Sequence, residues 1–188
     1  MNLFNETKFL MKKYDLVAAK KFGQNFLVDD EVVSEIVASS NITKNDLVIE
    51  IGPGLGTLTK ELLEKAGKVI CIEIDTRMIS ILEDRFNLYN NFELINDDIL
   101  KIDLGSIIDK YIAQEGNDTS SLYNAKVVAN LPYYITTPII MKLLEDKLNL
   151  SSITVMVQKE VADRLIAKPG SGNSGAITYG INYYTSPR

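Results

Sequence analysis

The chain has 188 residues, of which 46% are hydrophobic, and this suits one folded domain whose core can cover a sheet. It contains no histidine, so histidine-based catalytic triads are excluded, and we expect no metal site. No apolar run approaches the roughly 20 residues of a membrane span, and the lysine-rich start lacks the apolar core of a signal peptide. We therefore expect no membrane contact and a cytoplasmic location. The single cysteine, Cys71, stands in an apolar run and is expected to be a buried strand residue.

The net charge of −5 disfavours non-specific binding to nucleic acid, because phosphate neutralisation is the main source of that affinity. Its distribution is uneven, since residues 1–21 carry five lysines against Glu6 and Asp15. This positive end either steers the protein toward phosphate or is a solvated helix face, and the sequence leaves both interpretations open.

Helices and strands alternate along most of the chain. Apolar residues at helical spacing predict a helix that starts near Leu3 and ends before Phe22. The acidic run Asp29-Asp30-Glu31 opens a second helix that continues to about Ser39. Strands are expected over residues 47–51, 69–74, 92–95, 126–129 and 153–157, and helices over residues 57–66, 76–86, 107–113 and 138–148. Residues 114–121 and 168–175 have the composition of loops, the second of them mobile, and residues 177–184 are ambiguous between helix and strand. The order predicts an α/β domain with a mainly parallel sheet covered on both faces, and no clear second domain.

The first of these strands runs directly into Gly52, Gly54 and Gly56. Glycines at alternate positions let the backbone turn tightly and pass close to a ligand, although a plain turn is an alternative. A dinucleotide site needs a glycine at the sixth position of this turn, where the chain has Thr57. The pattern therefore favours another nucleoside cofactor over the nicotinamide dinucleotide of an oxidoreductase.

Two acidic residues follow the next two strands. Glu73 closes the second strand, where a carboxylate can accept hydrogen bonds from both hydroxyls of a ribose. Asp98 lies just beyond the third strand on the same edge, where it is placed to bind an adenine amino group; a solvated turn is the alternative.

The fourth strand leads into Asn130, Leu131, Pro132 and Tyr133. An adenine amino group is a poor nucleophile, so its methylation requires acceptors that hold its hydrogens in place. The side-chain oxygen of Asn130 and a backbone carbonyl near Leu131 can supply these acceptors. Pro132 stiffens the turn, and the ring of Tyr133 offers a stacking surface for an extruded base.

The glycine turn, with an acid at the end of the next strand, resembles class I S-adenosylmethionine methyltransferases, which have a Rossmann-like fold. Four segments resemble the bacterial small-subunit ribosomal RNA adenine N6,N6-dimethyltransferases: Phe22 to Leu27, Glu50 to Gly56, Asn130 to Pro138 and Val157 to Arg164.

This resemblance implies that methyl groups pass from S-adenosylmethionine to N6 of two adjacent adenines in small-subunit ribosomal RNA, within an assembling ribosomal subunit. It also implies which residues contact the cofactor: Asn25, Leu27, Gly52, Gly54, Glu73, Asp98 and Asn130. The segment from Asn130 to Tyr133 would then hold the target adenine.

The same family has a seven-stranded sheet followed by a small helical domain. Because only five strands are evident, we expect residues 1–188 to be a catalytic domain that stops before the last two strands and lacks the helical domain. Two alternatives remain. One is a macrolide-resistance methyltransferase of large-subunit ribosomal RNA, and the other is a related nucleic-acid-binding factor without catalysis.

Overall fold

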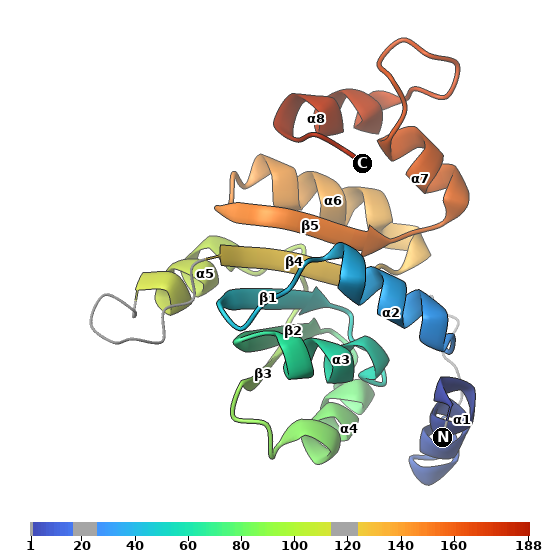
Figure 1. Cartoon of the computed structure of the whole chain (residues 1–188), viewed down its shortest axis with the longest axis vertical. Helices are drawn as coiled ribbons and strands as arrows, with labels where there is room; N and C mark the ends of the chain where they lie inside the picture. Colours follow the sequence, from blue (N-terminus) through green and yellow to red (C-terminus); the bar gives the residue numbers. More distant parts are fainter. Residues whose placement is uncertain (1, 17–25, 114–123) are drawn as a thin grey trace.

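The computed structural model describes residues 2–16, 26–113 and 124–188 (Figure 1). Five parallel strands form one sheet in the order β3-β2-β1-β4-β5. The strands are β1 (Asp46–Ile51), β2 (Lys68–Glu73), β3 (Phe92–Asn96), β4 (Asn124–Asn130) and β5 (Leu150–Met156). The predicted parallel α/β sheet is confirmed, and its five strands lie where they were expected to within a few residues.

Helices cover both faces of this sheet. One face carries α1 (Leu3–Lys13), α2 (Asp30–Ser39), α3 (Thr57–Lys65) and α4 (Thr76–Phe86). The other carries α5 (Leu104–Ala113) and α6 (Thr136–Glu145), together with α7 (Lys159–Leu165) and α8 (Ala176–Tyr184), which lie beyond β5 in Figure 1. A 3-10 turn, η2 (Tyr133–Ile135), precedes α6. None of the described helices is long and apolar enough to cross a membrane.

The core is divided by the sheet into two layers. All six residues of β1 are buried, as expected for a central parallel strand. Leu47 and Ile49 join the layer under α5 and α6, whereas Val48 joins the layer under α2, α3 and α4. Cys71 is fully buried in the second layer, which confirms its assignment as a strand residue.

Local hydrogen bonds explain where several helices begin. Asp29 is the N-cap of α2, and its carboxylate accepts the amide hydrogen of Glu31 (2.9 Å). Helix α5 begins three residues earlier than expected because Asp103 accepts the amide hydrogen of Ser106 (3.1 Å). Helix α1 ends at Lys13, and the remainder of the long helix predicted there lies partly outside the described residues, as does the loop predicted over residues 114–121.

The ambiguous segment near the end of the chain is a helix, α8. The hydroxyl of Thr178 donates to the carbonyl of Arg164 (2.7 Å) and accepts the amide hydrogen of Gly175 (2.9 Å), which ties α8 to α7. A β-carbon at Gly180 would lie 3.2 Å from Met141 of α6, so glycine permits the close packing of α8. Helix α7, which lies between β5 and α8 in the chain, was not predicted from the sequence.

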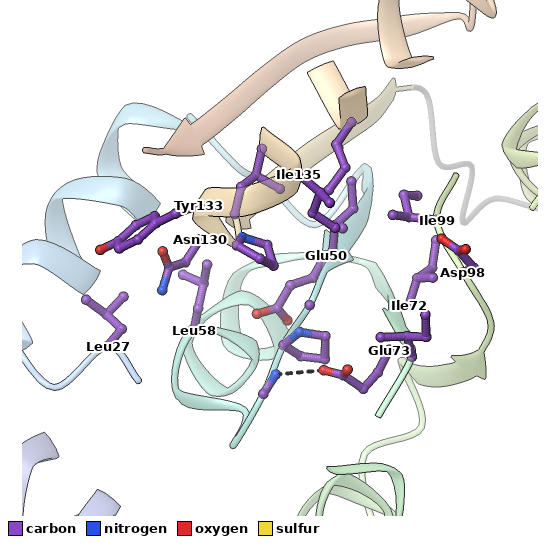
Figure 2. A pocket seen from close by; sticks show the side chains of 18 of the residues that line it. Leu27, Glu50, Leu58, Ile72, Glu73, Asp98, Ile99, Asn130, Tyr133 and Ile135 are labelled. Atoms are coloured by element: carbon purple, nitrogen blue, oxygen red, sulfur yellow. Dashed lines mark hydrogen bonds between the residues drawn. The ribbon is translucent and has the colours of Figure 1, made fainter. Parts of the chain in front are cut away.

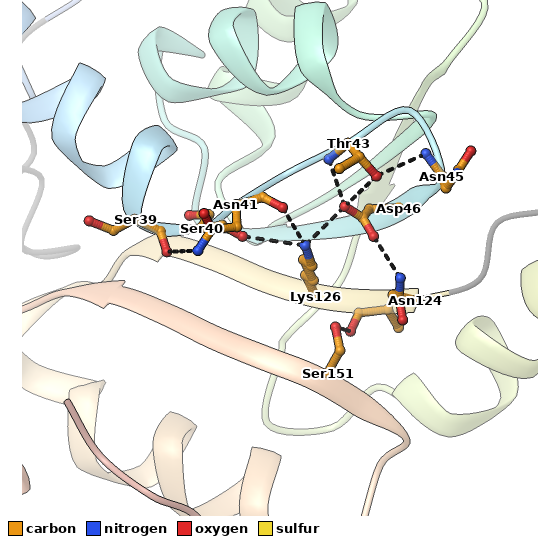
Figure 3. A network of polar contacts seen from close by, with 10 residues as sticks. Ser39, Ser40, Asn41, Thr43, Asn45, Asp46, Asn124, Lys126 and Ser151 are labelled. Carbon is orange, nitrogen blue, oxygen red and sulfur yellow. Dashed lines mark hydrogen bonds and ion pairs between the residues drawn. The ribbon is translucent and has the colours of Figure 1, made fainter.

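A buried polar network joins β1 and β4 at their amino ends (Figure 3). The ammonium of Lys126 contacts the Asp46 carboxylate (2.9 Å) and donates to the carbonyl of Asn41 (2.7 Å). Asp46 also accepts hydrogen bonds from the Thr43 amide (2.7 Å) and the Asn124 side chain (3.1 Å). Burial opposes the ionisation of Asp46, but these hydrogen bonds outweigh it, so its pKa lies below the usual value. The network therefore holds the amino ends of the central strands β1 and β4 together.

Candidate active site

A cavity of about 330 Å³ lies at the carboxyl ends of the central strands (Figure 2). From β1 the chain adds β2 and β3 toward one edge of the sheet, and it then returns to add β4 and β5 on the other side of β1. The strand order therefore reverses between β1 and β4. In open parallel sheets such a reversal leaves a crevice in which ligands bind. In Figure 2, Glu73 and Asp98 lie on one side of this cavity, and Asn130 and Tyr133 lie on the other.

The glycine loop, residues 52–56, forms the floor of the cavity between β1 and α3. All three of its glycines have positive φ angles, at 66°, 57° and 79°. A β-carbon at Gly56 would also lie 2.4 Å from the ring of Phe86 in α4, so only glycine fits there. The predicted tight turn is thus present, and it brings Gly52 and Gly54 to the cavity wall.

Glu73 lies at the end of β2, and its carboxylate is held by two backbone amides. The amide of Asp75 donates to Oε1 (2.9 Å), and the amide of Gly54 in the glycine loop donates to Oε2 (3.2 Å). Burial raises the pKa of Glu73, while these two hydrogen bonds act in the opposite direction. Each oxygen keeps a further lone pair, so the carboxylate is oriented to accept two more donors from a ligand.

Asp98 also lines the cavity, as the sequence predicted. Its Oδ1 accepts the amide hydrogen of Leu100 (3.0 Å), and its Oδ2 lies 3.4 Å from the ammonium of Lys101. The carboxylate is therefore positioned by its own turn and remains partly accessible from the cavity.

The segment from Asn130 to Tyr133 borders the cavity at the end of β4. Within the described residues, no hydrogen bond reaches the side chain of Asn130, which lies in the cavity in Figure 2. The carbonyl of Pro132 is already occupied by the Ile135 amide (3.2 Å) and the Thr136 hydroxyl (3.0 Å). The Asn130 side chain and the Leu131 carbonyl are thus among the acceptors that the segment can offer to a ligand.

Tyr133 stands at the mouth of the cavity, and 41% of its surface is exposed. Leu131 is buried, and its amide donates to the carbonyl of Met156 in β5 (3.2 Å), which anchors the segment beneath the exposed ring. An exposed aromatic ring on an anchored turn is available for stacking with a base.

The segment before α2 contributes Phe26 and Leu27 to the cavity. A β-carbon at Gly54 would lie 3.6 Å from the Phe26 ring, so this segment packs directly on the glycine loop. Asn25, the other residue expected here, lies outside the described residues.

Ile74 and Leu100 line the cavity but were not singled out from the sequence. Both remain substantially exposed, at 50% and 38%, although they are large and apolar. Ile74 directly follows Glu73 at the end of β2, and Leu100 lies two residues after Asp98 in the turn beyond β3. Apolar residues within two positions of these acids are the signal that would have identified them. Apolar side chains beside a carboxylate suit a ligand that joins a sugar to a flat ring.

Glu50 lies beneath the glycine loop and is almost completely buried. Its Oε2 accepts hydrogen bonds from the hydroxyl of Thr59 (2.6 Å) and the thiol of Cys71 (3.3 Å). Burial raises the pKa of Glu50 to about 7, although these hydrogen bonds lower it. Glu50 thus joins β1, β2 and α3 behind the loop.

Replacement of Glu50 by glutamine should remove a pH dependence of stability. The pKa of Glu50 is about 7 in the folded chain against an ordinary value of 4.5, so the folded state binds the proton more tightly. The stabilisation that the folded state gains from this tighter proton binding is complete below pH 4.5 and is lost as the pH rises through 7. We expect the free energy of unfolding of Glu50→Gln, relative to the wild type, to rise by about 3 kcal/mol between pH 4.5 and 8.

Urea denaturation at several pH values measures this difference. The exposed Glu64→Gln serves as the control and should keep a constant difference from the wild type. A constant difference for Glu50→Gln as well would contradict the raised pKa.

The described residues contain no group of three or more His, Cys, Asp or Glu side chains arranged to hold a metal ion. The lining of the cavity offers carboxylates, backbone amides, one carboxamide, hydroxyl groups and apolar walls.

Comparisons with solved structures agree with this arrangement. The crystal structure of a dimethyladenosine transferase from Plasmodium falciparum superposes with a TM-score of 0.66 and is 32% identical, over 84% of this chain and 52% of that one. The crystal structure of the 23S rRNA methyltransferase ErmE gives a TM-score of 0.62 at 27% identity, over 76% of this chain and 51% of that one.

Sequence comparisons identify the family. A protein of Lachnoclostridium phytofermentans named Ribosomal RNA small subunit methyltransferase A is 49% identical over 97% of this chain and 60% of its own length. A protein of the same name from Alkaliphilus oremlandii is 44% identical over 97% of this chain and 61% of its own length. The chain thus spans about 60% of the length of these relatives. The family model described as Ribosomal RNA adenine dimethylase matches residues 16–188, and the chain therefore belongs to that family.

Proposed function

We propose that this chain is the cofactor-binding and catalytic part of a methyltransferase that dimethylates N6 of two adjacent adenines in small-subunit ribosomal RNA. The observation that carries the proposal is that Glu73, Asp98 and Asn130 border one cavity together with the glycine loop. The names of the curated relatives support the choice of small-subunit RNA.

The cavity fits S-adenosylmethionine on its own chemistry. The Glu73 carboxylate is oriented by two amides and accepts the two ribose hydroxyls, and the exposed apolar surfaces of Ile74 and Leu100 cover the faces of the adenine ring. Asp98 accepts a hydrogen of the adenine amino group. The cofactor supplies a methyl group on a positively charged sulfur, which is reactive toward nitrogen.

The residues at the other side of the cavity prepare the acceptor base. The Asn130 side-chain oxygen and the Leu131 carbonyl accept the two hydrogens of the adenine amino group and so orient its lone pair toward the methyl group. Tyr133 stacks on the extruded base and holds it in the mouth of the cavity. The methylated amine then loses one proton to solvent, so no histidine is required.

Glu73→Ala tests the cofactor site in the chain as it stands. Removal of two hydrogen bonds to a charged acceptor should raise the Kd for S-adenosylmethionine by about 100-fold, because each such bond contributes roughly 1.5 kcal/mol or more. Isothermal titration calorimetry measures this change, with NAD as the control ligand and the exposed Glu64→Ala as the control variant.

Binding of NAD in place of S-adenosylmethionine by the folded wild-type chain would overturn the proposal. An unchanged Kd for Glu73→Ala would show that Glu73 does not bind the ribose hydroxyls.

The likeness to ErmE supports a second candidate, the methylation of large-subunit ribosomal RNA. Incubation of the full-length protein with unmethylated small subunits, with naked small-subunit RNA and with large-subunit RNA, each with radiolabelled cofactor, separates the two. We expect methylation of the assembling small subunit in the cytoplasm, so the label should enter small-subunit RNA and do so best in particles.

A further inference from the structure

Helix α1 is attached to α4 by two ion pairs of different character. Lys13 lies 2.8 Å from Asp84, and about half of each side chain is exposed. Glu6 lies 2.5 Å from Arg85, and these side chains are only 21% and 11% exposed. An exposed pair contributes little to stability, whereas a buried charge requires its partners. The Glu6–Arg85 pair is therefore the stronger constraint on α1.

Arg85 has a second contact, which reaches the cavity floor. One nitrogen of its guanidinium binds Glu6, and the other terminal nitrogen donates to the carbonyl of Leu55 in the glycine loop. A guanidinium is planar and presents several donors in a fixed fork, so it can hold two acceptors in one geometry. Arg85 thus connects α1 to the glycine loop through a single side chain.

The glycine loop depends on such contacts for its shape. Its three glycines with positive φ angles lose much conformational freedom when the loop is ordered. The loop is held on the cavity side by the bond from Gly54 to Glu73 and at its start by the bond from the Gly52 amide to Ile72 (2.9 Å). The Arg85 contact holds the Leu55 carbonyl from α4.

Helix α1 ends at Lys13 and so precedes residues 16–188, which the family model matches. Burial lowers the pKa of Arg85, and the charge of Glu6 opposes this change. Glu6 is thus the counter-ion of the buried guanidinium and holds it in place under the loop.

We infer that Arg85 is a positioning residue for the cofactor: by binding Glu6 and the Leu55 carbonyl together, it makes the docking of α1 fix the glycine loop in its ligand-binding shape. The inference rests on the proposed function for the identity of the ligand. It assigns to α1, which lines no part of the cavity, an effect on cofactor affinity.

Two ion pairs between the same helices provide a matched experiment. Arg85→Met removes the charged contact to the Leu55 carbonyl and should raise the Kd for S-adenosylmethionine about tenfold. Glu6→Gln only weakens the hold on the Arg85 guanidinium and should raise the Kd about threefold. Lys13→Met removes the other pair without touching the loop and should change the Kd by less than about twofold. Calorimetry on the chain measures binding, and thermal unfolding reports the stability that each variant loses.

Hydrogen exchange in the free protein gives a readout that does not involve the cofactor. The Gly56 amide, which donates to the Pro53 carbonyl (2.9 Å), should exchange faster in Arg85→Met and Glu6→Gln and at the wild-type rate in Lys13→Met. In the full-length protein, the KM for the cofactor should rise while kcat at saturating cofactor stays unchanged.

Equal effects of Lys13→Met and Glu6→Gln on the Kd and on loop exchange would overturn the inference, because helix docking alone would then account for them. Wild-type affinity in Arg85→Met would overturn it as well. Should Arg85→Met fail to fold, the comparison of Glu6→Gln with Lys13→Met decides. A wild-type chain that does not bind S-adenosylmethionine would contradict the proposed function, while the exchange rates would still decide whether Arg85 anchors the loop.

Discussion

Asn130→Ala should lower kcat for methyl transfer by at least about 100-fold, the effect typical of losing one group that stabilises a reacting centre. The side-chain oxygen of Asn130 is one of the two acceptors proposed above for the amino group of the target adenine. Its loss leaves the lone pair of the amine delocalised into the ring and poorly aligned with the methyl group. The fold should be retained, because within the described residues this side chain makes no hydrogen bond.

Transfer of radiolabel from S-adenosylmethionine to unmethylated small subunits by the full-length protein measures this effect. Asn90→Ala, at an exposed turn before β3 that does not line the cavity, is the control and should keep the wild-type rate. Asn130→Asp retains an acceptor of similar shape and should keep more activity than Asn130→Ala. A wild-type rate in Asn130→Ala would exclude Asn130 from catalysis.

Asp46→Ala should lower the free energy of unfolding by about 3 to 5 kcal/mol, because it leaves the Lys126 ammonium buried without its counter-ion. The Thr43 amide and the Asn124 side chain lose their acceptor at the same time. The affinity for the cofactor should change little in the protein that remains folded, since this network lies at the opposite ends of the strands from the cavity.

The change in midpoint of urea denaturation, at constant slope, measures the loss. Replacing both charged partners, in Asp46→Leu with Lys126→Met, should restore most of the stability because no unpaired charge remains. A cost below about 1 kcal/mol for Asp46→Ala would mean that water reaches Lys126 and replaces the carboxylate.

The alternation of helices and strands could be predicted from the sequence because its determinants are local. Apolar runs mark the buried strands, and Asp29 caps the helix that follows it. The meeting of Glu73, Asp98 and Asn130 in one cavity could also be predicted, because parallel strands end at the same edge of a sheet. These residues lie in the cavity, although their roles remain predictions.

Other features depend on contacts between distant segments. Helix α8 contains β-favouring tyrosine, threonine and isoleucine residues, and its packing on α6 and α7 decides its conformation. The contact between Arg85 and the Leu55 carbonyl spans 30 positions of the sequence, and no local pattern indicates it. The order of the strands likewise follows from pairing between distant segments.

Cys71 gives these experiments an internal reporter of unfolding. It is the only cysteine in the sequence, its side chain is fully buried, and burial places its pKa well above that of a free thiol. A thiol reagent added to the native protein can therefore react only when the second core layer opens. The labelling rate without denaturant should follow the opening equilibrium of each variant, and it should fall when a bound ligand stabilises the native state.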